Sequence, residues 1–301
     1  MNNYTIKIVS VYILLCFIWG STWLAIRFGL KSLTPVFSAG TRFIIASMVI
    51  FLLLKIKKIR VQTDGRSVKL YLLMGFFSFV IPFGLVYWGQ QFVPSGLAAV
   101  LFAVYPFFVL LFSFILLKSE EIGKNKIAGM ILSFAGIVTI FSDQLGGDLT
   151  SYVAGMIAIV LSGIMQASIA VIIKRYGQHL NPLSMNFIPM LIAGIVMFFA
   201  GLLLEDTSKL KFDNNAVLSV LYLAIFGSVV TFTSYYWLLK RMNIVVLSLI
   251  AFITPVVALF LGWIVMGEYL ETHQVTGSVM VLLGLLIANA VNLINQKPKQ
   301  I

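Results

Sequence analysis

The chain alternates long apolar runs with short polar linkers from one end to the other. Ten runs reach about 20 mostly apolar residues, the length that a helix needs to cross a bilayer. They cover residues 9–29, 35–54, 70–91, 95–117, 125–142, 152–173, 183–204, 216–239, 244–266 and 274–294. Linkers as brief as Val93-Pro94 make neighbouring helices antiparallel. Because no strand-like alternation interrupts the runs, the pattern predicts an all-α integral membrane protein with ten transmembrane helices.

The second half of the chain repeats landmarks of the first. Six residues recur 148 or 149 positions later, namely Tyr87, Trp88, Pro106, Glu120, Gly129 and Gly136, matched by Tyr236, Trp237, Pro255, Glu268, Gly277 and Gly284. A duplication of this length predicts two five-helix repeats, residues 1–147 and 148–301. An odd number of spans places the second copy upside down, and inverted repeats are typical of alternating-access carriers.

The composition excludes an ordinary soluble protein. The 301 residues are 60% hydrophobic and 10% charged, with a mean hydropathy of +1.04, whereas soluble domains carry about 25% charged residues. The net charge of +11 does not indicate nucleic-acid binding, because the basic residues lie scattered in short loops and form no single basic face. We therefore expect the lipid bilayer as a partner, and no nucleic acid.

The lysine and arginine residues predict an orientation. If the N-terminus is cytoplasmic, 16 basic residues lie on the cytoplasmic side and four on the other. Cytoplasmic loops of membrane proteins carry such an excess. We expect a multi-pass protein of the cell inner (cytoplasmic) membrane with both termini in the cytoplasm.

The acidic residues narrow the chemistry by their positions. All ten lie in linkers or at the ends of predicted helices, so no carboxylate is placed to relay a proton or to bind a lipophilic cation within the membrane. Cys16 is the single cysteine, which rules out a disulfide within the chain and a cysteine/histidine metal cluster. We expect no metal, no cofactor, no catalytic residues and no enzymatic activity. A neutral or zwitterionic substrate fits this pattern best.

Two prolines lie at matched depth in the membrane. Pro106 and Pro255 are each the twelfth residue of a predicted helix. Proline lacks an amide donor, so each frees the carbonyl four residues earlier, at Phe102 and Ala251. A freed carbonyl must be satisfied by a water-filled cavity or by a neighbouring helix. Because the prolines recur in both halves, we expect them to be hinge or kink residues beside a central cavity, and packing against a neighbour is the alternative.

Several polar and aromatic residues inside the predicted spans are candidates for binding a small organic molecule. Trp88 and Trp237 are close enough to helix ends to anchor the protein at the membrane surface. Rings and amides deeper in the spans can stack on a ligand or donate hydrogen bonds to it. The predicted substrate-cavity residues are Trp19, Thr22, Tyr87, Gln90, Tyr105, Gln166, Tyr236 and Thr254. The alternative role for each is a polar bridge between helices.

Arg42 lies about 10 Å along its helix from Pro35. At that depth an arginine can hold a substrate carboxylate in a forked hydrogen bond. The alternative is that its long side chain snorkels to the headgroups. Sequence alone leaves both open.

Two further repeated features have a structural explanation as well as a functional one. The pairs Gly129/Gly136 and Gly277/Gly284 each place two small residues on one helix face. Such faces favour close helix packing, and they also allow a homodimer. Glu120 and Glu268 can cap or gate helix ends, or remain ordinary solvated charges.

The chain resembles EamA-type members of the drug/metabolite transporter superfamily over essentially its whole length. The resemblance is carried by the order and spacing of several short motifs. These are Trp19-Gly20-Ser21-Thr22, Pro35, Arg42-Phe43, Val93-Pro94-Ser95-Gly96-Leu97-Ala98-Ala99, Pro106, Thr254-Pro255-Val256-Val257 and Gly267-Glu268. One departure is that the sixth predicted helix lacks a counterpart of Trp19-Gly20.

The resemblance implies two inverted five-helix repeats around a central cavity, lined by the first, third and fourth helices of each half. The fifth helix of each half is then peripheral. This arrangement brings the eight substrate-cavity candidates into range. It argues against direct substrate contact by Arg42, since the second helix usually lies outside the lining. Relatives export or import metabolites, so the family does not determine the substrate.

Together these features predict a secondary transporter that moves a small organic metabolite by alternating access. An amino acid or a related neutral or zwitterionic compound is the expected substrate, and export is the expected direction. The alternatives are a non-transporting membrane scaffold or assembly protein, a membrane enzyme of lipid intermediates, and a passive channel.

Overall fold

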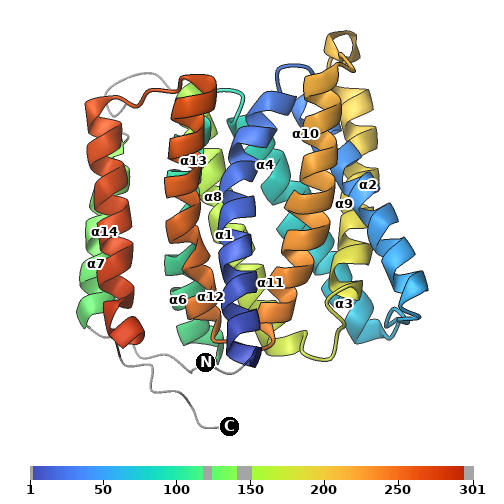
Figure 1. The fold of residues 1–301 in the computed structure, drawn as a ribbon, viewed down its shortest axis with the longest axis horizontal. Coiled ribbons are helices and arrows are strands. Elements are labelled where there is room, and N and C mark those ends of the chain that lie inside the picture. The colour runs from blue at the N-terminus through green and yellow to red at the C-terminus, as the bar shows by residue number, and fades with distance from the viewer. Residues whose placement is uncertain (1–2, 118–123, 141–150, 295–301) are drawn as a thin grey trace.

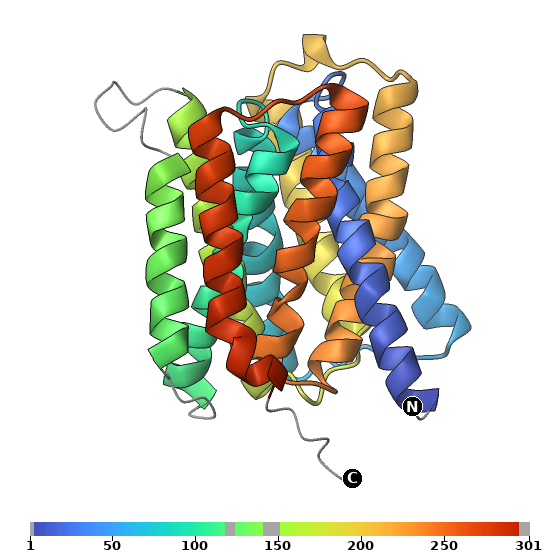
Figure 2. The same cartoon turned by 60° about the vertical axis from the view of Figure 1, so that its left-hand side comes forward.

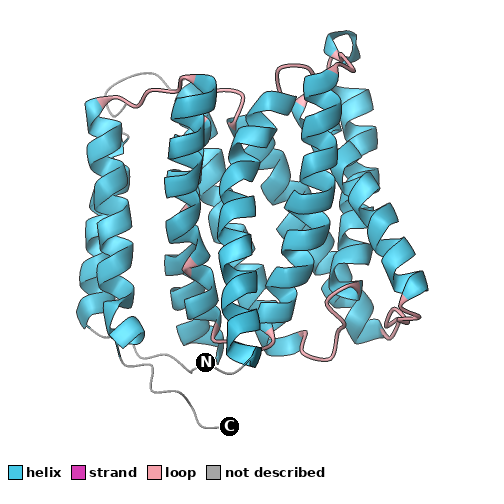
Figure 3. Cartoon of the chain, viewed as in Figure 1, coloured by secondary structure: helices cyan, strands magenta, loops and turns pink. Residues whose placement is uncertain are grey.

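The computed structural model describes residues 3–117, 124–140 and 151–294. Over these residues the helices form ten runs gathered in one bundle (Figure 1), and Figure 3 shows no strand in this part of the chain. Six runs are single helices: α1 Asn3–Gly29, α2 Pro35–Ile56, α7 Lys124–Ile140, α8 Ser151–Tyr176, α9 Ser184–Leu204 and α14 Thr272–Ile294. A short 3₁₀ turn, η3 Thr207–Lys209, lies in the loop after α9.

The other four runs are interrupted. The third is α3 Gly65–Met74, the π-helix η1 Gly75–Val80 and α4 Ile81–Gly89. The fourth is α5 Ser95–Phe102 and α6 Tyr105–Leu117. The eighth is α10 Asn214–Ala224, the π-helix η4 Ile225–Val230 and α11 Thr231–Leu239, and the ninth is α12 Ile244–Ser248 and α13 Ile250–Met266.

The predicted all-helical membrane fold is confirmed. Eight runs are long and apolar enough to cross a membrane, and Ile127–Ile140 within α7 is a shorter apolar helix. Successive runs alternate in direction, so α8, the first run of the second half, is antiparallel to α1. The start of α1 and the end of α14 lie on the same side of the bundle (Figures 1 and 2). The predicted boundary between residues 147 and 148 falls in 141–150, outside the described residues.

Polar caps explain where several runs begin. The third run starts at Gly65 and not at residue 70, because the Asp64 carboxylate accepts a hydrogen bond from the Ser67 amide at 3.1 Å. Asp213 accepts from the Ala216 amide at 2.9 Å and sets the start of α10 in the same way. Such caps satisfy amides that have no partner within the helix. The bonds from Ser67, above all from its hydroxyl, also hold the pKa of the Asp64 carboxyl below its ordinary value.

Glycines allow two pairs of helices to approach closely. A Cβ at Gly40 of α2 would lie 2.3 Å from the backbone nitrogen of Phe198 in α9, and one at Gly194 of α9 would lie 2.7 Å from that of Ile44. The pair α7 and α14 packs together at one edge of the bundle, as both Figure 1 and Figure 2 show.

The repeated glycines serve this second contact. A Cβ at Gly136 would lie 2.6 Å from the Gly277 carbonyl oxygen, and one at Gly284 would lie 2.5 Å from that of Gly129. The close helix packing expected of these small faces therefore occurs within one chain, between α7 and α14. A dimer through these faces would have to displace the α7–α14 contact.

Candidate functional site

A cavity of about 110 Å³ lies at the centre of the bundle. Its wall comes from the first, third, fourth, sixth, eighth and ninth runs, with one residue of α2. Six of the eight predicted cavity residues line it, namely Trp19, Thr22, Tyr105, Gln166, Tyr236 and Thr254. Apolar cavities of roughly 150 Å³ hold a benzene molecule, so this space suits the apolar part of a small metabolite.

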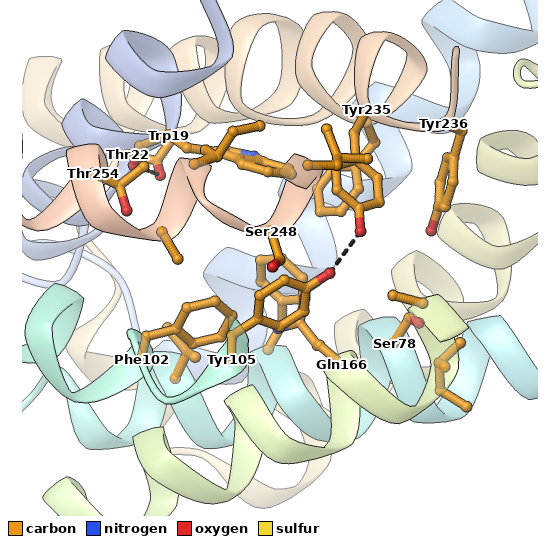
Figure 4. A pocket seen from close by; sticks show the side chains of 18 of the residues that line it. Trp19, Thr22, Ser78, Phe102, Tyr105, Gln166, Tyr235, Tyr236, Ser248 and Thr254 are labelled. Carbon is orange, nitrogen blue, oxygen red and sulfur yellow. Dashed lines mark hydrogen bonds between the residues drawn. The ribbon is translucent and has the colours of Figure 1, made fainter. Parts of the chain in front are cut away.

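Aromatic side chains face each other across the cavity. Figure 4 shows Trp19, Tyr235 and Tyr236 on one wall, and Phe102 and Tyr105 on the opposite wall. The hydroxyl oxygens of Tyr105 and Tyr235 lie 2.6 Å apart in a hydrogen bond that joins the two halves of the chain. The rings of Trp19 and Tyr235 are 5.3 Å apart between centroids. These contacts build a surface that can stack on a flat or apolar ligand.

Two predicted cavity residues lie behind this wall. Tyr87 is fully buried, and its hydroxyl accepts a hydrogen bond from Arg42 Nη1 at 3.2 Å. Gln90 is also fully buried and donates from Nε2 to the Trp23 carbonyl at 3.2 Å. Tyr87 therefore supports a lining residue from behind, and Gln90 holds α4 against α1.

The position of Arg42 bears on both roles that the sequence left open for it. Its side chain is 2% exposed and lines the cavity, so it does not snorkel to the headgroups. Direct contact with a ligand, which the resemblance argued against, is open to it, because α2 packs against α4 and η4 and reaches the cavity between them.

The two prolines do not line the cavity, and they act differently on their helices. The helix breaks at Ala103 and Val104, between α5 and α6, and α6 begins at Tyr105, one residue before Pro106. Pro255, in contrast, lies inside the continuous helix α13, and its run is interrupted at Leu249. The interruptions in the two halves are therefore not at equal distances from the prolines.

The sixth run has no Trp-Gly pair, but a glycine on α8 makes a close approach like that of Gly20 on α1. A Cβ at Gly20 of α1 would lie 2.5 Å from Val257 Cβ and 3.2 Å from the Thr254 carbonyl oxygen. A Cβ at Gly163 of α8 would lie 3.3 Å from the carbonyl oxygen of Phe102. Both glycines thus let a helix approach the proline-containing run of the other half.

Sequence reasoning missed several residues of the wall, including Ser78, Phe102, Ser248 and Tyr235. The repeat contained a signal for one of them. Val86 and Tyr235 are related by the same shift of 149 as Tyr87 and Tyr236, and both line the cavity. Tyr87 was selected because it is identical to Tyr236, although Val86, one position earlier on the same helix, is the one of the two that lines the cavity.

No acidic side chain lines the cavity among the residues that the structure describes. Glu268 instead caps a helix of the other half on the side of the bundle away from the chain ends. Its carboxylate accepts hydrogen bonds from the Ser95 hydroxyl at 2.7 Å and the Ser95 amide at 3.1 Å. Glu120, its counterpart in the repeat, lies outside the described residues.

The fold and the central cavity define a multi-span membrane transporter, and comparison with known proteins identifies its family. The model of the EamA-like transporter family matches residues 6–142 and again residues 153–290. The chain therefore belongs to the EamA-like transporter family. It is a transporter and not an enzyme, and a membrane transporter contacts both lipid and a small-molecule substrate.

Individual relatives support this assignment. The chain is 33% identical over 260 residues to the uncharacterized inner membrane transporter YedA of Escherichia coli strain K12, covering 84% of this chain and 81% of that protein. It is 27% identical to protein PagO of Salmonella typhimurium, covering 94% of this chain and 92% of the relative. One solved crystal structure superposes with a TM-score of 0.72 over 97% of this chain and 99% of its own length at 16% identity, which shows a shared fold alone.

Proposed function

We propose that this protein exports a small organic metabolite across the cytoplasmic membrane by alternating access. The observation that carries the proposal is the central cavity, which both halves line with aromatic and hydroxyl-bearing side chains. An amino acid or a related neutral or zwitterionic compound is the expected substrate class. The name of the relative YedA, an inner membrane transporter, supports the location, and the lysine and arginine bias supports cytoplasmic termini.

In this mechanism residues 1–147 and 148–301 act as two inverted repeats that rock around the cavity. The break between α5 and α6 is a natural hinge, because Ala103 and Val104 interrupt the helix where the Phe102 ring lines the cavity. The Tyr105–Tyr235 hydrogen bond joins the halves at the cavity. Motion of one half would break this contact and change access to the ligand.

Comparative metabolomics tests the function. Cells that express the protein and cells that lack it are compared for metabolites inside and in the medium. Depletion inside with enrichment outside is expected and would identify the substrate. Uptake in place of export would contradict the direction, and unchanged pools in both compartments under all growth conditions would contradict the proposal and favour a scaffold role.

We expect the Glu268 cap to help hold the cavity closed on the outer side, because it joins the second half of the chain to the start of α5 in the first half. Losing the charge should weaken a helix cap by about 1–2 kcal/mol, which corresponds to an increase of about tenfold in the outward-open population. In a Cys16→Ser background, Thr22→Cys places a thiol in the cavity. With Glu268→Gln added, a membrane-impermeant maleimide should label this thiol from outside several times faster.

Glu271→Gln is the matched control for this experiment. Glu271 lies near Glu268 in the same linker, and its carboxylate is 3.5 Å from His273 Nδ1. Equal labelling rates in the two variants would show that the Glu268 cap does not hold the cavity closed.

A further inference from the structure

The guanidinium of Arg42 is a buried positive charge with neutral hydrogen-bond partners. Nε donates to the Ser228 hydroxyl at 2.8 Å, Nη1 to the Tyr87 hydroxyl at 3.2 Å and Nη2 to the Gly227 carbonyl at 2.7 Å. The rings of Phe43 and Phe83 lie 5.2 Å and 5.1 Å from its central carbon. No aspartate or glutamate of the described residues hydrogen-bonds to it, so its charge is not neutralised within this part of the chain.

Helix packing does not require an arginine at this place. In the other half, Ile192 of α9 packs against Gly75 at the start of the π-helix η1. Arg42, 150 positions earlier on α2, lies against Gly227 within the π-helix η4, but through its terminal Nη2 and not through aliphatic carbons. An aliphatic side chain therefore suffices for the contact in one half, whereas the other half buries a charge in a bilayer-spanning protein. A buried charge without an opposite partner is costly and indicates a functional role.

Two donors of Arg42 remain for a ligand. The guanidinium has five N–H groups, and the three bonds use one on each nitrogen. One N–H is left on each terminal nitrogen, and the residue lines the cavity. One free donor on each terminal nitrogen is the set that a carboxylate needs for a bond to each of its two oxygens.

The rest of the wall determines what the carboxylate can be attached to. Phe83, Phe102 and Phe232 line the cavity and can contact an apolar body. An ammonium group would find no carboxylate among the described lining residues. The cavity is therefore suited to bind the carboxylate group of a ligand, and the ligand does not need an amine.

On the basis of the proposed export of a small metabolite, we infer that Arg42 is the receptor for the carboxylate of the substrate, and that the substrate is a small monocarboxylate with an apolar body in place of a neutral compound. An apolar amino acid meets this description through its carboxylate, and so does the corresponding acid without an amine. A neutral amide does not.

Ligand binding to purified protein in detergent tests the inference. The probes are phenylacetate and 4-methylpentanoate, with phenylacetamide and 4-methylpentanamide as neutral analogues of nearly equal shape, and inorganic phosphate as a second anion. Binding is measured by the shift in Tm and by the fluorescence of Trp19 and Trp23, which line the cavity. We expect the carboxylates to bind at least about tenfold more tightly than the amides and phosphate, as the loss of charge-assisted bonds implies.

Arg42→Ile, which copies the residue used in the other half, should keep or raise the Tm without ligand and lose carboxylate binding. Lys55→Gln removes a charge from an exposed position of the same helix and should bind like the unaltered protein. If Arg42→Ile does not fold, Arg42→Lys is the variant to measure. Lysine keeps the positive charge but cannot donate two parallel hydrogen bonds to one carboxylate, so the affinity for carboxylates should fall about tenfold.

Equal binding of amides and carboxylates, preference for phosphate, or unchanged carboxylate binding in the Arg42 variant that folds would overturn the inference. So would the absence of carboxylate binding in a protein that still changes metabolite pools in cells, and in that case the proposed function stands. Unchanged metabolite pools together with carboxylate binding would instead overturn the proposed transport function, while the carboxylate site at Arg42 would still stand.

Discussion

Replacing Gly40 by alanine should prevent stable folding or lower the stability by about 3 kcal/mol, the upper part of the usual range for overpacking. The added methyl group would lie 2.3 Å from the backbone nitrogen of Phe198 and 2.6 Å from its Cα. A backbone cannot rotate away as a side chain can, so α2 and α9 would have to separate. The measurement is the Tm and the yield of monodisperse purified protein.

Gly84→Ala is the matched control for this change. Gly84 also lies within a membrane helix, but a Cβ there would meet only the flexible end of Met197 at 4.0 Å. Alanine is a better helix former than glycine, so the control should be neutral or slightly stabilising. Equal Tm values for the two variants would contradict the close α2–α9 contact.

Replacing Pro106 by alanine should reduce export about tenfold, equivalent to about 1.4 kcal/mol in a rate-limiting barrier. Alanine restores an amide that can bond to the Phe102 carbonyl, so α5 and α6 can join into one helix across Ala103 and Val104. The hinge would stiffen, and the Phe102 ring would turn away from its place in the cavity. Export is measured in cells with the metabolites that the comparative metabolomics identifies.

Two other prolines provide controls. Pro255→Ala should reduce export less, because α13 is already continuous through Pro255. Pro189→Ala should leave export unchanged, since α9 is continuous through this proline and contributes no residue to the cavity wall as described. Unchanged export in both the Pro106 and the Pro255 variants would count against rocking about these helices.

Much of the fold was predictable because its signals are local. Span length follows from runs of apolar residues, and the inverted second half follows from a repeat with an odd number of spans. The helix ends were less accurate where a polar cap such as Asp64 extends the helix beyond its apolar part. The π-helices η1 and η4 were not predicted, since no simple residue pattern marks this wider turn.

The site was predictable in part. Thr22 and Thr254 could be selected because polar groups inside a span need partners. The choice between Tyr235 and Tyr87 was harder, because each has a neighbour on its own helix, Tyr236 and Val86, that points about 100° away from it. One lines the cavity and the other supports Arg42 from behind.

By itself the sequence determined a ten-helix membrane protein in two inverted halves, with an aromatic, acid-free centre. These properties depend on length, composition and repetition along the chain. Only the tertiary structure decided that Arg42 faces the cavity and that the repeated glycines join α7 to α14. The physical reason is that a membrane helix is apolar towards lipid as well as towards its neighbours. Periodicity therefore does not distinguish the inner face from the outer one, and the facing helix must be known.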